Sequence, residues 1–243
     1  MDPIMQFEQA RERRIKDQGK NVPLIDAANN FQEGSIKSLY SYNFSWMGRP
    51  LIQYPQDIVV MQEILWKVKP DLVVETGIAH GGSIIFYSSI LELIGKGLVL
   101  GIDVDIRTHN RKLIEAHPMF NRIEMIEGDS VSEEVFAQVR EIAGDKRTVL
   151  VCLDSMHTHE HVIKELELYS SIVTKGSYLV VFDTIIEDLS EDCIGDRSWG
   201  KGNNPKTAVH EFIKKTDRFV IDKAIENKLL ITVAPDGYLK CVK

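Results

Sequence analysis

The chain has 243 residues, of which 44% are hydrophobic and 27% charged, which suits one large α/β domain with a full core and leaves no room for a second. Its net charge of -7 argues against a nucleic-acid partner, because binding to a phosphate backbone generally needs a basic face. Three cysteines without metal-type spacing, no apolar run of membrane-spanning length and no signal-like start predict a protein of the reducing cytoplasm, away from membranes.

Residues 1–55 are expected to form an N-terminal helix and an aromatic arm. Ile4, Phe7 and Ile15 recur at helical spacing among charged residues, which predicts an amphipathic helix that packs on the body or on a second subunit. Aromatic residues gather among turn residues at 38–55, where they would partly wall a substrate and partly tie the arm down. A homo-oligomer is therefore expected.

Residues 56–243 are expected to form a single Rossmann-like domain. After a helix at 56–68, strands are predicted at 72–75, 97–103, 122–127, 148–153 and 178–182, with helices between them. This alternation predicts a doubly wound, mostly parallel α/β sheet. A lid-like loop at 184–206 and a helix to 215 follow, and then strands at 219–221 and 229–234 and a last strand after the turn at 235–237, with a closing antiparallel strand.

The stretch Leu72–Ser83, LVVETGIAHGGS, predicts a strand, a glycine-rich turn and the start of a helix. The strand would bring Glu75 to the carboxyl edge of the sheet. The glycines would let a ligand approach the backbone N–H groups at the helix start. A nucleotide-like cofactor suits this turn, although the pattern differs from G-x-G-x-x-G and a purely structural turn is an equal alternative.

Acidic residues mark the ends of the predicted strands: they are Glu75, Asp103, Asp129, Asp154 and Asp183. Because parallel strands end at one edge of the sheet, these carboxylates should share a rim, where they need cations or hydrogen-bond donors. Asp103, 28 residues after Glu75, is placed to bind ribose hydroxyls. Asp154 and Asp183 with Thr184 offer hard oxygen ligands for Mg²⁺ or Ca²⁺. Helix capping by Asp129 and structural ion pairing of Asp154 or Asp183 are the alternatives.

Three histidines follow Asp154 closely. His157, expected in a turn, could act as a general base because the unperturbed pKa of histidine lies near neutrality. His159 and His161 are expected in the first turns of a helix, as caps or exposed residues. An iron site built from His157, His161 and an aspartate is an alternative that would require His157 on a helix face.

The ordered motifs ETGIAHGGS, GIDVD, EGDS, LDSMHTHEHV and LVVFDT resemble those of S-adenosylmethionine-dependent O-methyltransferases. More closely, residues from about 46 to 210 are similar to the cephalosporin hydroxylase or rhamnosyl O-methyltransferase family. Metal-dependent catechol O-methyltransferases look similar at the same positions.

The resemblance implies a role for each matching residue. The cofactor S-adenosylmethionine would contact Glu75, Gly77, Ala79, Ser83, Asp103, Val104, Asp129 and Ser130. Mg²⁺ would be held by Asp154, Asp183 and Thr184. Thr184 stands in place of an asparagine, so that Glu187 is an alternative ligand, and His157 stands in place of a catalytic lysine.

The implied reaction is methyl transfer to a hydroxyl of a sugar or another small natural product. Asp154 would hold the metal that lowers the pKa of this hydroxyl, and His157 would take its proton. The aromatic arm and the 184–206 loop would enclose the acceptor. An iron-dependent hydroxylase and a non-catalytic cofactor-binding partner protein are the competing hypotheses.

Overall fold

The computed structural model describes residues 2–243, and a seven-stranded sheet lies at its centre with the strand order β5-β4-β3-β6-β7-β9-β8. The five parallel strands are β3 (Leu72–Thr76), β4 (Leu98–Asp103), β5 (Ile123–Glu127), β6 (Val149–Leu153) and β7 (Tyr178–Val181). The strand β9 (Tyr238–Cys241) runs antiparallel to β7 and to β8 (Phe219–Ile221). The predicted doubly wound sheet with a closing antiparallel strand is confirmed.

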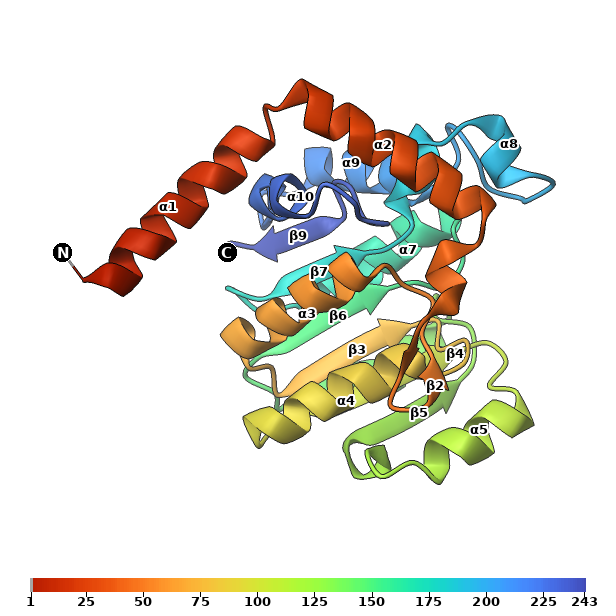
Figure 1. Ribbon diagram of the computed structural model, residues 1–243. Helices are drawn as coiled ribbons and strands as arrows, with labels where there is room; N and C mark the ends of the chain where they lie inside the picture. Colours follow the sequence, from red (N-terminus) through yellow and green to blue (C-terminus); the bar gives the residue numbers. More distant parts are fainter. Residues whose placement is uncertain (1) are drawn as a thin grey trace.

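Helices cover both faces of the sheet (Figure 1). One face packs against α3 (Pro55–Val68), α4 (Gly82–Ile94), α5 (Thr108–Glu115) and α10 (Lys223–Leu229), and the other against α6 (Glu133–Ala143), α7 (His159–Tyr169) and α9 (Pro205–Lys215). Within β3, Val73 joins the first core, whereas Leu72 and Val74 join the second. Burial on both faces explains why the central strands are continuously apolar.

The order of the strands creates a crevice between β3 and β6. The chain adds β4 and β5 on one side of β3 and then returns to place β6 and β7 on the other. Crossovers that leave neighbouring parallel strands in opposite directions open a gap at the carboxyl ends, where ligands of such sheets bind. Asp103 and Asp154 both lie at this end.

The N-terminal segment contains two long helices, α1 (Pro3–Gln18) and α2 (Val22–Lys37), then η1 (Tyr40–Asn43) and the hairpin of β1 (Ser45–Trp46) and β2 (Arg49–Pro50). The predicted first helix is present, but α2 was not anticipated. Figure 1 shows α1 projecting from the body, and none of its residues is buried. Its end is anchored by Gln18, whose amide donates to the carbonyls of Asn227 and Lys228 at 2.9 and 3.0 Å.

The prediction of a strand at 229–234 is wrong. Helix α10 occupies 223–229, and the following segment is a loop. The buried carboxylate of Asp57 accepts the Val233 N–H at 2.9 Å, so this N–H is not available to a strand partner. The Asp57 carboxylate also binds the Tyr238 hydroxyl at 2.7 Å, which joins the loop to the sheet.

The loop after β7 holds the short helices η4 (Thr184–Asp188) and α8 (Glu191–Ile194), and η2 (Phe120–Arg122) and η3 (Ser170–Ile172) precede β5 and β7. No helix in the range 2–243 combines the length and the apolar character that crossing a membrane requires.

Candidate active site

A cavity of about 560 Å³ lies at the carboxyl ends of β3, β4, β5 and β6. Eight of the residues singled out from the sequence line it: Gly77, Ala79, Ser83, Asp103, Val104, Asp129, Ser130 and Asp154. These residues come from four separate strand ends, so the topology brings them together as the parallel sheet requires. Its size is typical of a cavity for a small-molecule cofactor.

The glycine-rich turn between β3 and α4 is shaped by close backbone contacts. Gly77 has φ +87°, and a Cβ atom there would lie 2.1 Å from the carbonyl oxygen of Asp154. The carboxylate of Asp103 accepts hydrogen bonds from the N–H groups of Ile78 at 2.8 Å and Ala79 at 3.2 Å. Ala79 has φ +46°, an uncommon conformation for a residue with a side chain. The turn is therefore held in one shape before any ligand binds.

Two residues that were not predicted as site residues, Arg49 and Asn110, bind backbone carbonyls of the same turn. Arg49 donates to the carbonyl of His80 and to Oδ1 of Asn110, the latter at 3.0 Å. The Asn110 amide donates to the carbonyl of Ala79, also at 3.0 Å. Sequence reasoning missed both residues, because nothing in the local pattern of β2 or α5 indicates which distant carbonyl they reach.

Another wall of the cavity consists of residues 50–53, from the last residue of β2 onward. It lies so close to α4 that a Cβ atom on Gly82 would be 2.1 Å from the Pro50 carbonyl oxygen. Gln53 is buried, and its Oε1 atom has no hydrogen-bond partner. The N-terminal arm thus contributes to the cavity that the glycine-rich turn opens.

Glu75 lies beneath this cavity rather than on its wall. Its side chain is fully buried, Oε2 accepts a 2.5 Å hydrogen bond from the Ser83 hydroxyl, and Oε1 has no partner. Burial raises the pKa of the Glu75 carboxyl to about 8, and the nearby charge of Asp103 adds to the shift. A cation placed near Ser83 would favour the ionised carboxylate, so the pair fits the ammonium group of an amino-acid moiety.

A buried carboxylate also supports the opposite wall. Glu165 on α7 accepts from the hydroxyls of Ser130 at 2.6 Å and Ser155 at 2.8 Å. Nε2 of His161 lies 3.5 Å from the same carboxylate and 3.1 Å from each hydroxyl oxygen. Burial opposes protonation of His161, but Glu165 outweighs it and raises the pKa of the imidazole. His161 lies in the first turn of α7 as predicted, but the expectation of a cap or an exposed residue is wrong, because these contacts hold the half-buried imidazole in the cavity wall.

A cluster that could hold a metal ion adjoins the cavity at Asp154. Among the described residues, Asp154, His157 and Asp183 form the one group of three whose potential ligand atoms lie within 4.8 Å of one another. Burial and the charge of Asp183 raise the pKa of Asp154 well above its ordinary value. A divalent cation would stabilise the partly buried carboxylates of Asp154 and Asp183, which repel each other, so the residues fit Mg²⁺.

Thr184 and Glu187 point elsewhere. The Thr184 hydroxyl is buried and donates to the Pro235 carbonyl at 2.6 Å. Oε2 of Glu187 accepts from the Gly202 N–H at 2.8 Å and from the Asn204 amide. The group that accompanies the two aspartates is His157, which lies in the turn before α7 as expected.

The long loop after β7 reaches the site through Trp199. The indole packs edge-on against the imidazole of His157, with ring centroids 5.0 Å apart, and it also lines the cavity. Glu187 fixes the same loop through the two bonds to Gly202 and Asn204. The loop predicted as a lid therefore contacts the Asp154–His157–Asp183 cluster through Trp199.

The sequence profile of the family described as Rhamnosyl O-methyltransferase/CmcI matches residues 38–242. A rhamnosyl O-methyltransferase of Mycobacterium leprae is 28% identical over 198 residues, which cover 80% of this chain and 82% of the relative. One from Mycobacterium tuberculosis strain H37Rv is 27% identical over 201 residues, with 80% and 77% covered.

Two solved structures of CmcI share the fold. The structure described as CmcI-N160 apo and that described as cmcI-D160 Mg-SAM each have a TM-score of 0.59 and 18% sequence identity. Both structural alignments cover 83% of this chain, and they cover 77% and 78% of the respective CmcI chains.

Proposed function

We propose that the chain, which belongs to the rhamnosyl O-methyltransferase/CmcI family, transfers a methyl group from S-adenosylmethionine to a hydroxyl of a sugar or another small natural product with Mg²⁺ bound. The observation that carries the proposal is the continuity of the cavity with the Asp154–His157–Asp183 cluster, since Asp154 belongs to both. The CmcI structure described with Mg-SAM supports the same pair of cofactors.

The residues of the turn and of the cavity would hold the cofactor. The ammonium group would lie near Ser83 and Glu75, whose unpartnered Oε1 then gains a positive charge nearby. Asp103 would bind the ribose, and Val104, Asp129 and Ser130 would surround the adenine. Asp103 already holds two backbone N–H groups of the turn, so one carboxylate would join the turn to the ribose.

Asp154 and Asp183 would hold Mg²⁺, and the role of Thr184 as a third ligand stays a prediction. When bound, the ion supplies Lewis acidity that lowers the pKa of an acceptor hydroxyl. Nε2 of His157 lies 3.1 Å from Oδ2 of Asp183, so Nδ1 is the atom left to take the hydroxyl proton. Asp183 would stabilise the resulting imidazolium, and Trp199 would shield it from water.

The iron hydroxylase hypothesis needs His157 and His161 at one metal ion. Only His157 belongs to the cluster, and Nε2 of His161 faces Ser130, Ser155 and Glu165 instead. The geometry favours methyl transfer over this alternative.

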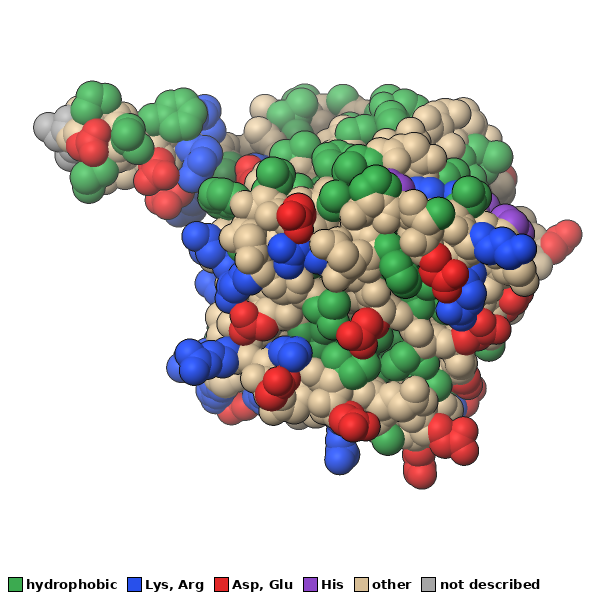
Figure 2. All heavy atoms as spheres, turned by 90° about the horizontal axis from the view of Figure 1, so that it is seen from below, with side chains coloured by type: hydrophobic (Ala, Val, Ile, Leu, Met, Phe, Trp, Pro, Cys, Tyr) green, Lys and Arg blue, Asp and Glu red, His purple; other side chains and the backbone are tan. Residues whose placement is uncertain are grey.

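A homo-oligomer is also proposed. Helix α1 exposes Ile4, Met5 and Phe7, which are 69%, 52% and 60% accessible, and Figure 2 shows apolar side chains on the projecting arm. Helices in proteins owe most of their stability to tertiary packing, and none of the 16 residues of α1 is buried within the chain. A second copy of the chain would supply that packing.

The test is calorimetric titration with S-adenosylhomocysteine, followed by Mg²⁺ titration and by transfer of labelled methyl groups to a panel of glycosides. Binding of the nucleoside and metal-dependent labelling of a hydroxyl are expected. Absence of nucleoside binding would refute the proposal, and binding with no labelling that depends on Asp154 would favour a non-catalytic partner protein.

A further inference from the structure

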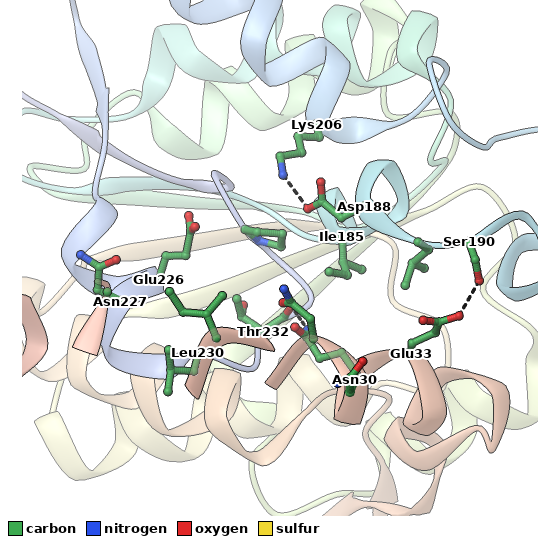
Figure 3. Close-up of a pocket in the computed structure, with 16 residues that line it drawn as sticks. Asn30, Glu33, Ile185, Asp188, Ser190, Lys206, Glu226, Asn227, Leu230 and Thr232 are labelled. Atoms are coloured by element: carbon green, nitrogen blue, oxygen red, sulfur yellow. Dashed lines mark hydrogen bonds and ion pairs between the residues drawn. The ribbon is translucent and has the colours of Figure 1, made fainter. Parts of the chain in front are cut away.

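A second cavity, of about 440 Å³, lies beneath α2 and shares no lining residue with the cofactor cavity. Its walls come from the α1–α2 junction, α2, η4, α10 and the loop at 230–235, as Figure 3 shows. Helix α2 is fixed across it by Gln32, whose amide donates to the Thr232 carbonyl at 2.7 Å. The cavity is therefore bounded by the arm on one side and by the C-terminal segments on the other.

The charged groups around this cavity already have partners. Nζ of Lys206 lies 2.6 Å from Asp188, and Glu33 accepts from Ser190 at 2.8 Å (Figure 3). Glu33 also accepts from Lys37 at 3.1 Å. Glu226 accepts from Lys223 at 3.0 Å. A charged ligand would find no unpaired charge of opposite sign here. A metal ion is not favoured either, because these carboxylates form no cluster of potential ligands within residues 2–243.

Three amide side chains line the same cavity without a side-chain hydrogen bond to any described residue: Asn29 and Asn30, at solvent-exposed positions of α2, and the half-buried Asn227 on α10. Each amide offers both donors and an acceptor. Figure 3 shows Asn30 and Asn227 reaching the cavity from different elements. Ile25, Ile185 and Leu230 add apolar surface between them.

We infer that this cavity is a second binding site, for a neutral ligand rich in hydroxyl groups, such as a glycoside. Hydroxyls pair with amides and with carboxylates that are already neutralised, and the C–H faces of a sugar ring pack on aliphatic side chains. The volume is within the range of small-ligand sites. The site stands independently of methyl transfer, because none of its lining residues belongs to the cofactor cavity or to the metal cluster.

The test is titration of the full chain, without cofactor or metal, with methyl glycosides of rhamnose, mannose and glucose, followed by ligand-observed NMR. Saturable binding with a Kd on the order of 1 mM is expected for at least one glycoside. Asn30→Ala and Asn227→Ala should each weaken it about threefold to tenfold, since each removes a hydrogen bond. Asn30→Trp should abolish it by filling the cavity. The matched control is Asn121→Ala, an exposed asparagine outside the cavity.

Circular dichroism and S-adenosylhomocysteine titration of each variant check the fold and the cofactor cavity separately. The inference is overturned if no glycoside binds the wild-type chain, or if binding survives Asn30→Trp. It is also overturned if Asp154→Asn removes glycoside binding while Asn30→Trp does not, because the sugar would then occupy the proposed methyl-transfer site.

Discussion

Nε2 of His157 lies 3.1 Å from Oδ2 of Asp183, and both side chains share their cluster with a carboxylate oxygen of Asp154. Burial and the charge of Asp183 raise the pKa of Asp154, so its ionised form is unfavourable without a cation. We predict that Asp154→Asn raises the Tm of the metal-free protein by about 2–4 °C, which corresponds to about 1 kcal/mol for a chain of this size. The same variant should lose methyl transfer.

Thermal unfolding with and without MgCl₂ checks this prediction. Wild-type protein should be stabilised by Mg²⁺, whereas Asp154→Asn should not. Asp196→Asn, at an exposed position in the loop after β7, is the matched control and should respond as the wild type does. A Mg²⁺-dependent rise in Tm that persists in Asp154→Asn would contradict a metal site at this residue.

The buried Glu75 predicts a pH dependence of stability. Its pKa is about 8 in the folded protein and has the ordinary value of 4.5 in the unfolded chain. Between pH 4.5 and pH 8 the Glu75 carboxyl is therefore protonated in the folded protein and ionised in the unfolded chain. The contribution of this proton to the free energy of unfolding is fully present below about pH 4.5 and is lost as the pH rises through 8. The Tm of Glu75→Gln relative to wild type should rise between pH 5 and pH 8. A difference in Tm that does not change with pH would count against the raised pKa.

The glycine-rich turn predicts opposite outcomes for two small substitutions. Gly77→Ala should abolish nucleoside binding, because the new Cβ would lie 2.1 Å from the Asp154 carbonyl oxygen at φ +87°. Ala79→Gly should keep binding and gain up to about 1 kcal/mol in stability, since it relieves the positive φ of +46°. Titration with S-adenosylhomocysteine and thermal unfolding measure both effects. Equal behaviour of the two variants would show that the turn is not shaped by these contacts.

Glu187 is predicted to restrain the loop that carries Trp199. The N–H of Gly202 and the amide of Asn204 lower the pKa of Glu187 against the effect of its burial, so the ionised carboxylate holds the loop at neutral pH. Glu187→Ala should speed tryptic cleavage after Arg197 and Lys201. Glu191→Ala, on the same loop but without these bonds, should be cleaved at the wild-type rate. Indistinguishable cleavage of the two variants would remove this role from Glu187.

The exposed face of α1 predicts self-association. Phe7→Glu should reduce the average molar mass of the protein in sedimentation velocity experiments, because a charge would replace the apolar side chain that a second copy covers. Arg13→Glu, also on α1, tests whether charge alone matters and should have a smaller effect. A wild-type chain that sediments as a monomer at all concentrations would refute the proposal.

The position of the acidic residues at one edge of the sheet could be predicted from the sequence, because local sequence patterns are enough to locate the strands at whose ends these residues lie. Continuous apolar runs give the strands, and Asp103 and Asp154 end two of them, so their common edge follows from parallel topology. Gly77 could likewise be assigned to a tight turn, because only glycine takes its backbone conformation at little cost.

Contacts over long sequence separations could not be predicted in this way. The orientation of Thr184 depends on the Pro235 carbonyl, 51 residues later, and the loop at Val233 depends on Asp57. Helix α2 could have been predicted, since Leu24, Ala28 and Phe31 recur at helical spacing after the N-cap Asn21, but its position depends on distant contacts such as that of Gln32 with Thr232. A single sequence gives no sign of which partner such a side chain meets.

The hydrogen bonds of Arg49 and Asn110 to the glycine-rich turn make the arm a structural part of the nucleoside pocket. A truncated chain that begins at residue 56 would keep every strand of the seven-stranded sheet, but the His80 carbonyl and Oδ1 of Asn110 would lose Arg49 as their donor. During biosynthesis, the hairpin at 45–50 leaves the ribosome first and must wait for the turn and α5 before it can dock. Evolutionary changes at position 49 should therefore alter the shape of the pocket, although the Arg49 side chain does not line it.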